Sequence, residues 1–532
     1  MTITPQGQLY LCKTKLENDY KNQLTFSNAT EQLTYFNSVI QHTFSDYTYI
    51  KKDNAVKVGK NIDEIIDCNY LFYKNEGFTN KYYFCFITNM EYVNENCTLI
   101  TFETDCYQTW LFQIEYKQSF VEREHVNNDT IGLHTIPENL ETGEYIINEL
   151  GRIDDNDELT TTYICMGVSW TPDNIPNYTD DRKYGGVYSG LSYFVFSDAS
   201  SCSKMCKAYD DLAKADAIYT LFLVPKGLIG TLEWYTFNLG NQEGIVSSFP
   251  TSTTFSTTII GNKQITSPTT LNGYTPKNNK LYCWPFNYLY LSNNNGADVT
   301  FNYEDFINNT PIFNVDGVIS TGCSIRLHPS NYKKINTAQN YPKMLSNFGL
   351  PVGKYPTCSW NSDPYTNWLT EQAINLPLQI GGLGLSLAST VATGGATGGA
   401  VVSSAMQIGS LLSSVYQHSL VPEQAKGNTN TGDVVTGMRL NSVNYYKMSI
   451  KEEYARSIDE YFNMFGYKIN RVKTPNITGR RYYNYVKTVD CNFDGDIPQT
   501  DLQIIKAMFN NGVTLWHDPS KIYDYSVSND II

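Results

Sequence analysis

Charged side chains are scarce in this sequence, and the strongest metal, redox and nucleotide motifs are missing. Asp, Glu, Lys and Arg make up 17% of the 532 residues, against about a quarter in a typical soluble protein. The 12 Cys include no Cys-x-x-Cys pair, so we expect most of them to be small buried hydrophobic residues and not zinc or redox centres. No Gly-Lys-Ser/Thr phosphate loop occurs, so an ATP-driven motor is not expected.

Basic residues are also in deficit. The chain has 39 Lys and Arg against 53 Asp and Glu, which gives a formal net charge of -14. Proteins that bind nucleic acid tightly usually present a basic face to the phosphates. The balance therefore argues against tight DNA binding, although it allows DNA to pass nearby without adhering.

Aromatic and alternating runs predict a mainly β chain. Aromatic residues reach 14%, with 41 Tyr, which excludes a disordered chain. At this length we expect three or four domains of α+β character, with barrel- or sandwich-like sheets and few short helices. The predicted strands are 82–87, 98–104, 109–114, 163–168, 280–285, 288–291 and 513–516. The predicted helices are 203–217, 450–464, 501–509 and one short helix within 24–39.

One segment has no charge at all. Residues 372–422 contain no Asp, Glu, Lys or Arg, and Glu371 and Glu423 bracket them. Two arms, 374–393 and 399–417, are each about as long as the roughly 20 helical residues that cross a bilayer. A Gly-rich turn lies between them, so the layout is that of a hairpin.

The hairpin has two interpretations. Gly, Ser and Thr dilute its apolar residues, which makes it marginal as a permanent anchor and suited to a segment that is sheltered first and inserted later. The first arm alternates with period two, so it fits a strand as well as a helix. On composition alone, a buried core hairpin or a low-complexity loop is the more common outcome.

Several runs resemble one family of phage proteins. These runs are 18–22, 106–112, 119–126, 465–473, 484–486, 495–497 and 511–517. They are similar to the distal tail knob proteins of short-tailed bacteriophages of the phi29 type. The resemblance is strong at both ends of the chain and weak from about 130 to 370.

The resemblance implies a virion structural protein and not an enzyme. Family members form a homohexameric tube at the tip of the tail, with β-rich walls, and contact the lower collar or tail tube and a separate tip protein that degrades the cell wall. Six hydrophobic loops plug the lumen, then leave it and form a pore in the host cytoplasmic membrane through which the viral DNA passes. The implied location is the virion tail, with transient residence in the host membrane, and no cofactor is implied.

Carried over to this sequence, the resemblance divides the chain into five parts. These are an N-terminal β tube domain (1–130), a β-rich middle part (131–345), a connector (346–371), the membrane-active loop (372–422) and a C-terminal α+β segment that completes the tube (423–532). The residues expected to contact lipid are Leu378, Ile380, Leu383, Leu385, Leu387, Val391, Val401, Val402, Met406, Ile408, Leu411, Leu412 and Val415. The tip that inserts first would contain Gly394, Gly395, Gly398 and Gly399.

Three alternatives are kept. Asp490, Asn492, Asp494 and Asp501 have the spacing of an EF-hand calcium loop, but an Asp replaces the usual final Glu, and we interpret the stretch as a turn before a helix. His125 could act as an acid or base, but no nucleophile pattern accompanies it, so a structural role is expected. The whole chain could instead be a cell-wall hydrolase of the tail or a receptor-binding module.

Overall fold

The computed structural model describes most of the chain outside one long central stretch. The described residues are 7–45, 47–50, 53–75, 81–154, 158–159, 161–173, 175, 183–184, 187–188, 190–229, 231–248, 258–293, 296–318, 323–333, 349–354, 357–359 and 443–532. They belong to two compact units. The first comprises 1–143, 273–281 and 452–532, and the second comprises 144–272 and 282–451.

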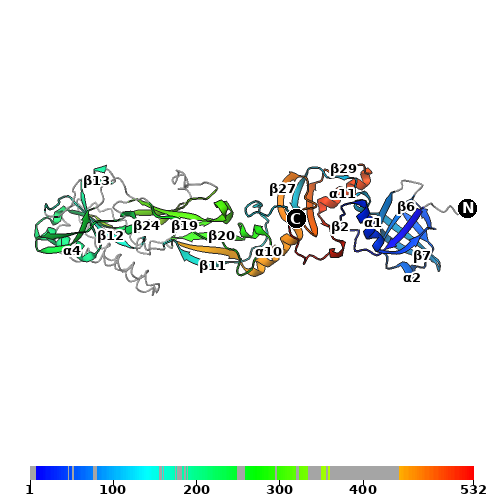
Figure 1. Ribbon diagram of the computed structural model, residues 1–532, viewed down its shortest axis with the longest axis horizontal. Helices are drawn as coiled ribbons and strands as arrows, with labels where there is room; N and C mark the ends of the chain where they lie inside the picture. Colours follow the sequence, from blue (N-terminus) through cyan, green and yellow to red (C-terminus); the bar gives the residue numbers. More distant parts are fainter. Residues whose placement is uncertain are drawn as a thin grey trace, which may run out of the picture. The chain divides into compact units, whose positions relative to one another are not determined.

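The predicted mainly β class is confirmed. Figure 1 shows long and short strands throughout the described parts of both units, with only a few short helices. The described cysteine side chains are free thiols, and all of these except Cys97 are buried. This is the role of small hydrophobic residues that the composition predicts.

The first unit contains a seven-stranded sheet of antiparallel pairs. Its strand order is β3-β1-β6-β7-β8-β5-β4. The strands are β1 (Gly7–Cys12), β3 (Ile40–Phe44), β4 (Tyr47–Ile50), β5 (Ala55–Val58), β6 (Tyr70–Asn75), β7 (Tyr82–Asn94) and β8 (Cys97–Thr104). The predicted strands 82–87 and 98–104 are thus confirmed as parts of the neighbouring strands β7 and β8.

A second sheet in this unit is made from both ends of the chain. Its order is β2-β30-β28-β10-β27. The strands are β2 (Asn22–Leu24), β10 (Ser119–Glu124), β27 (Tyr467–Lys473), β28 (Tyr483–Asp490) and β30 (Val513–Trp516). One core cluster joins Phe36 and Phe72 to Tyr483 and Trp516. The N-terminal and C-terminal parts of the chain therefore fold as one body.

The helices of this unit largely follow the sequence pattern. They are α1 (Ala29–Ser38), α2 (Ile62–Ile65), α3 (Cys106–Trp110), α10 (Glu452–Phe465) and α11 (Gln499–Asn511). The predicted short helix in 24–39 is confirmed as α1, whose N-cap Asn28 accepts a hydrogen bond from the Glu31 amide. The predicted helices 450–464 and 501–509 are α10 and α11. Gly512 ends α11 with φ 92°, a conformation that favours glycine.

Two predicted strands are wrong. The apolar, β-prone run at 109–114 predicts a strand, but α3 occupies Cys106–Trp110 and only the short β9 (Ile114–Glu115) follows it. Asp105 caps α3 by accepting a hydrogen bond from the Gln108 amide, and this capping overrides strand propensity. Residues 280–285 begin as a 3-10 turn, η3 (Asn279–Tyr282), and Pro285 has no amide with which to continue a ladder.

The second unit has one large core between several sheets. The six-stranded sheet has the order β17-β18-β15-β12-β16-β25, and two four-stranded sheets have the orders β11-β26-β20-β21 and β19-β22-β23-β24. The strands of the six-stranded sheet are β12 (Thr162–Val168), β15 (Ser192–Phe196), β16 (Ile218–Pro225), β17 (Tyr235–Leu239), β18 (Gln242–Ser248) and β25 (Thr357–Ser359). The strands of one four-stranded sheet are β11 (Tyr145–Arg152), β20 (Asn287–Ser292), β21 (Asp298–Phe301) and β26 (Asn444–Ile450). Those of the other are β19 (Thr258–Gln264), β22 (Ile312–Val318), β23 (Ser324–Pro329) and β24 (Leu350–Lys354).

The remaining sequence predictions for this unit are mostly confirmed. Residues 163–168 lie in β12 and 288–291 in β20. The predicted helix 203–217 is α4 (Ala199–Asp211) followed by η2 (Ala215–Ala217). The helix begins before the predicted start because Asp198 caps it, accepting a hydrogen bond from the Ser201 amide.

The cap of α3 is a fully buried carboxyl group. Asp105 has 0% exposure. Its Oδ1 accepts a hydrogen bond from the Gln108 amide at 3.1 Å, and its Oδ2 accepts one from the Tyr70 hydroxyl at 2.9 Å. Burial raises the pKa of Asp105 to about 7, against these hydrogen bonds, which lower it.

We expect Asp105 to make the first unit less stable as pH rises from 5 to 8. Its pKa is 3.8 in the ordinary, unfolded setting and about 7 in the folded unit, so the folded state binds more protons in this range. Ionisation of the buried carboxyl should lower the free energy of unfolding by roughly 2–3 kcal/mol across the range. Asp105→Asn keeps a capping oxygen but cannot ionise. The melting temperature of the variant relative to the parent should therefore rise with pH.

The matched control is Asp67→Asn, because the Asp67 side chain is 81% exposed. Its effect on the melting temperature should be small and nearly independent of pH. A pH-independent difference for Asp105→Asn would show that the carboxyl is ionised throughout and would refute the prediction.

Candidate functional site

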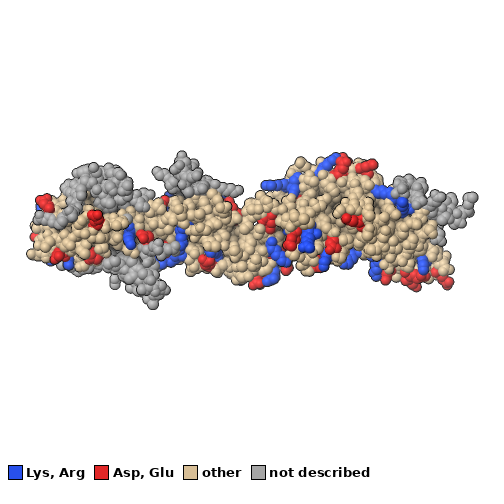
Figure 2. Space-filling view, viewed as in Figure 1, with Lys and Arg blue, Asp and Glu red and all other residues tan. Residues whose placement is uncertain are grey.

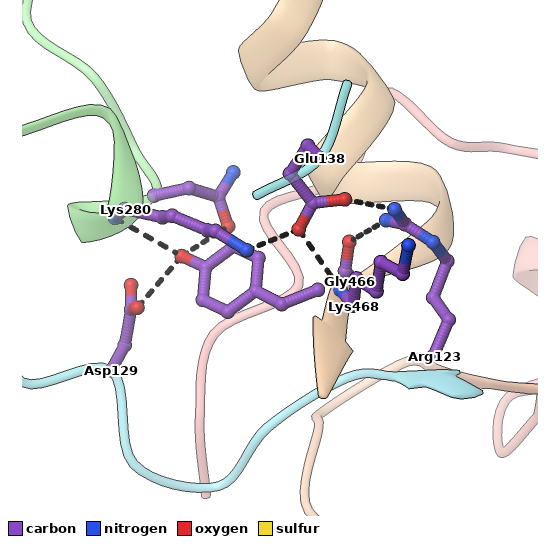
Figure 3. Close-up of polar contacts among 8 residues, drawn as sticks. Arg123, Asp129, Glu138, Lys280, Gly466 and Lys468 are labelled. Atoms are coloured by element: carbon purple, nitrogen blue, oxygen red, sulfur yellow. Dashed lines mark hydrogen bonds and ion pairs between the residues drawn. The ribbon is translucent and has the colours of Figure 1, made fainter. Parts of the chain in front are cut away.

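The described part of the first unit contains a buried polar centre built around Glu138. The Glu138 side chain is 1% exposed and forms ion pairs with Arg123 and Lys280, whose side chains are 9% and 3% exposed. Figure 3 shows the two cations reaching the carboxylate from different chain segments. Two basic groups thus face one carboxylate away from solvent.

Backbone groups complete this centre. Glu138 Oε1 accepts a hydrogen bond from the Lys468 amide at 2.9 Å, and Arg123 Nη1 donates to the Gly466 carbonyl at 2.6 Å (Figure 3). Gly466 has φ 64°, and a Cβ there would lie 2.1 Å from the Glu124 carbonyl oxygen. The turn between α10 and β27 therefore requires glycine so that its backbone can approach β10.

A second carboxylate, Asp129, fixes the neighbouring segment. Its Oδ1 accepts a hydrogen bond from the Tyr467 hydroxyl at 2.7 Å, and its Oδ2 accepts one from the Asn279 amide at 2.8 Å. The Tyr467 hydroxyl also accepts a hydrogen bond from the Lys280 amide at 3.5 Å. Burial raises the pKa of Asp129.

A third carboxylate, Asp459 on α10, holds the start of the same segment. It accepts hydrogen bonds from the Tyr274 hydroxyl at 2.7 Å, the Lys277 amide at 2.8 Å and the Asn278 amide at 3.0 Å. Residues 273–281 lie in sequence between two parts of the second unit but belong to the first. Three carboxylates therefore attach this short segment to the first unit.

His125 has the structural role that the sequence predicts. Its Nδ1 accepts a hydrogen bond from the Tyr485 amide at 2.7 Å, and its Nε2 lies 3.0 Å from the Asn463 carbonyl oxygen, to which it donates. Burial lowers the pKa of His125 to about 3, so the ring is neutral at physiological pH. Both ring nitrogens are engaged by backbone, which leaves neither for proton transfer to a substrate.

Two of the four residues of the calcium-loop alternative have other side-chain contacts. Asp494 forms an ion pair with Lys117 at 2.7 Å, and Asp501 accepts a hydrogen bond from the Trp110 indole at 2.7 Å. Asp490 ends β28, and the Asn492 amide donates to the Ser119 hydroxyl at 2.9 Å. Within the described ranges, no group of three or more His, Cys, Asp or Glu is arranged to hold a metal ion. The interpretation as a turn before a helix is kept, and the calcium loop stays only an alternative to it.

A cavity of about 650 Å³ lies beside α11 in the first unit. Its wall is mostly apolar and includes Phe465, Tyr485 and Met508, while Asp19 and Lys21 on its lining pair with each other at 3.2 Å. No Ser, Cys or His contributes to this lining. The cavity therefore offers mainly apolar contact.

The predicted membrane-active segment, 372–422, lies outside the described residues. This includes its lipid-contact residues, Leu378, Ile380, Leu383, Leu385, Leu387, Val391, Val401, Val402, Met406, Ile408, Leu411, Leu412 and Val415, and its tip, Gly394, Gly395, Gly398 and Gly399. Within the part of the chain that is described, no helix combines the length and apolarity needed to span a bilayer.

Glu138 and Lys280 were not identified from the sequence. Glu138 is separated from Arg123, Lys280 and Lys468 by 15, 142 and 330 positions. No local spacing could reveal such a cluster. The sequence signal near it is the Arg123-Glu124-His125 run, in which the histidine is the residue with an apparent chemical role.

Comparison with known proteins defines the class. Residues 8–116 match the N-terminal part of the caudoviral major tail proteins. The tail knob protein gp9 of Bacillus phage B103 is 26% identical, over 97% of this chain and 96% of the relative. The tail knob protein gp9 of Bacillus phage phi29 is 26% identical, over 98% of both chains. The protein is therefore a structural component of a bacteriophage tail.

The family follows from a second match. Residues 249–530, more than half of the chain, match the C-terminal domain of the phi29 tail knob protein gp9. The chain belongs to this family of phage tail knob proteins. The solved structure of the bacteriophage C1 tail knob protein gp12 is similar in fold, with a TM-score of 0.62 and 15% identity, over 99% of this chain and 100% of that one.

We expect Glu138→Gln to destabilise the first unit strongly. The change removes the charge that compensates Arg123 and Lys280, which stay buried. Breaking a buried ion pair in this way typically costs about 3–5 kcal/mol. The measurement is the denaturant midpoint of the first unit, monitored by intrinsic fluorescence or by hydrogen exchange of residues 119–143.

Glu141→Gln provides the control, since Glu141 is exposed and three residues away. We expect that substitution to change stability by less than about 0.5 kcal/mol. Equal effects of the two substitutions would mean that the Glu138 charge does not stabilise the unit.

Proposed function

We propose that this chain forms a homohexameric tube at the distal end of a short phage tail, and that residues 372–422 act on the host cytoplasmic membrane. The observation that carries this proposal is the charge-free run of 51 residues in a chain of the tail knob family. In the proposed cycle the six loops plug the lumen before infection. They then leave it and form a pore for DNA ejection.

The composition of the loop supports this cycle. Its Leu, Ile and Val residues favour lipid, while its Gly, Ser and Thr residues make the preference for lipid modest. A segment of intermediate polarity can be sheltered by protein and later transferred to a bilayer. The proposed partners are the lower collar or tail tube, the tip protein and the host membrane.

The charge balance supports the passage of DNA without adhesion. Six copies at -14 each would give a strongly acidic tube. Figure 2 shows basic and acidic side chains mixed over most of the visible face, without a continuous basic stripe. Phosphates have little to bind on such a surface.

Dye leakage from liposomes tests the membrane role. We expect the full chain to release an encapsulated dye across some part of a pH series, and a version lacking 372–422 to release none. Because a deletion can disturb folding, Ile408→Asp and Leu412→Asp provide a milder test. A carboxylate at the centre of a membrane helix costs about 2.5–3.5 kcal/mol, so leakage should fall several-fold.

Thr429→Asp is the matched control, because it places the same charge in the polar stretch after the segment. It should leave leakage unchanged. Equal leakage from the full chain and from the version lacking 372–422 would remove the membrane role and leave a tube protein.

DNA binding tests the proposed passage. We expect the full-length protein to bind a fluorescent 30-base-pair duplex more weakly than the roughly 1–100 µM typical of non-specific DNA-binding proteins at physiological salt. The measurement is fluorescence anisotropy from low to physiological salt. Tight binding that weakens steeply with salt would reveal a basic DNA-contacting surface and contradict the proposal.

A further inference from the structure

The four-stranded sheet β11-β26-β20-β21 of the second unit has one face in the core, and its opposite face carries Tyr, Met and aliphatic side chains. Leu289, Leu291 and Phe301 point into the large core cluster. Side chains alternate between the faces of a strand, so their neighbours in sequence lie on the opposite face. On that opposite face, the strand register aligns Leu150 with Tyr446 and Tyr290, and Ile147 with Met448 and Tyr288.

These six side chains, which we call the aromatic face, form two rows across three strands. A register shift between Ile147 and Glu149 inserts Asn148 as an extra residue in β11, so Ile147 and Leu150 point the same way. The Asn148 side chain is held at the bulge by the Ser449 hydroxyl at 2.7 Å and the Asn272 amide at 2.9 Å. The bulge thus adds two aliphatic side chains to a face that is otherwise Tyr and Met.

Aromatic packing extends the face at one end. Tyr290 and Tyr446 have ring centroids 5.6 Å apart. Tyr288 contacts Tyr145 at 5.2 Å and Trp284 at 5.1 Å, both edge to face. Ile147, Leu150 and Trp284 are 55%, 59% and 46% exposed. A connected apolar surface of this kind marks a binding surface more often than ordinary protein exterior.

None of the six side chains of the aromatic face is charged. The next row of the same face contains two charged residues of opposite sign, Arg152 and Asp298. Arg152 Nη2 lies 4.0 Å from Asp154 Oδ2. Lys447 lies on the other side of the sheet, with its Nζ 2.6 Å from Glu149, and Lys451 pairs with Glu144 at 2.7 Å. An anionic lipid surface is normally bound by unpaired Lys and Arg beside the apolar residues. The pairing of Arg152 and of these two lysines with carboxylates, in a chain of net charge -14, disfavours lipid as the occupant.

The same features favour a second copy of this chain. Acidic copies repel one another wherever their charged surfaces meet, so association is most favourable through surfaces without charge. The centres of protein interfaces are depleted in charge and enriched in Tyr, Trp and Met. The aromatic face has this composition, and its most exposed members are large apolar side chains.

We propose that the aromatic face is the surface on which a neighbouring copy of this chain docks in the assembled tail knob. The inference rests on the proposed ring assembly and identifies a contact surface for it. In a closed ring each contact joins unlike surfaces, so the neighbour presents a surface other than its own aromatic face.

The test places a charge on the face and measures assembly. Leu150→Glu and Ile147→Glu should raise the dissociation constant between copies at least about 100-fold, a change that corresponds to about 2.7 kcal/mol. Native mass spectrometry and sedimentation velocity of the full chain give the distribution of oligomers. Ile245→Glu in the same unit is the control, since Ile245 is 45% exposed and lies on β18.

Mixtures of Leu150→Glu copies with unmodified copies give a more specific test of the contact. A Leu150→Glu copy still offers its other surface to a normal copy, so mixtures should contain short open oligomers that cannot close. Hydroxyl-radical footprinting of the unmodified protein gives an independent measure that does not depend on folding of a variant. Assembly should protect Met448 and Trp284 from oxidation.

The outcomes are distinguishable. Unchanged assembly of Leu150→Glu and Ile147→Glu, or no protection of Met448, would overturn the inference while the proposed ring stands. Vesicle binding by the unmodified protein that is lost in Leu150→Glu would assign the face to lipid instead. An unmodified chain that stays monomeric at every concentration would overturn both the ring and the inference.

Discussion

The buried Glu138 carboxylate is the interaction on which the architecture of the first unit depends. It holds two cations, Arg123 and Lys280, together with the Lys468 amide, away from water. Removal of each ion from water costs several kcal/mol, and only the complete set compensates that cost. The segments that carry these groups must therefore come together or not at all. This requirement specifies how the two ends of the chain and the crossing segment 273–281 are joined.

Charged groups lie in the buried polar centres of the first unit, whereas the surfaces that we propose to contact another copy or a membrane carry none. The charged groups of the Glu138 centre are paired, and Asp129 and Asp459 are satisfied by hydrogen bonds. By contrast, the six side chains of the aromatic face carry no charge, and neither does the segment 372–422. An acidic protein that must assemble with itself and meet a membrane gains from this separation, because repulsion between its copies is confined to other parts of the surface.

The sequence predicted elements whose signals are local. The alternating residues of β8 were sufficient to predict a strand, and the apolar spacing of α10 was sufficient to predict a helix. The glycine after α11 was sufficient to predict where that helix ends. The assignment failed at α3, where the Asp105 cap outweighed a run of β-prone residues, and at 280–285. Glu138 could not be found, because its partners are brought together only by the fold. The family resemblance was correct, whereas the role of 372–422 stays a proposal, since that segment lies outside the described residues.

The division of the first unit between the two ends of the chain has a consequence for synthesis in the host. The sheet β2-β30-β28-β10-β27 needs strands from both before residue 125 and after residue 466. A nascent chain can therefore complete the second unit while the first still lacks its last strands on the ribosome. A product that terminates before residue 513 therefore lacks β30 and leaves this sheet incomplete.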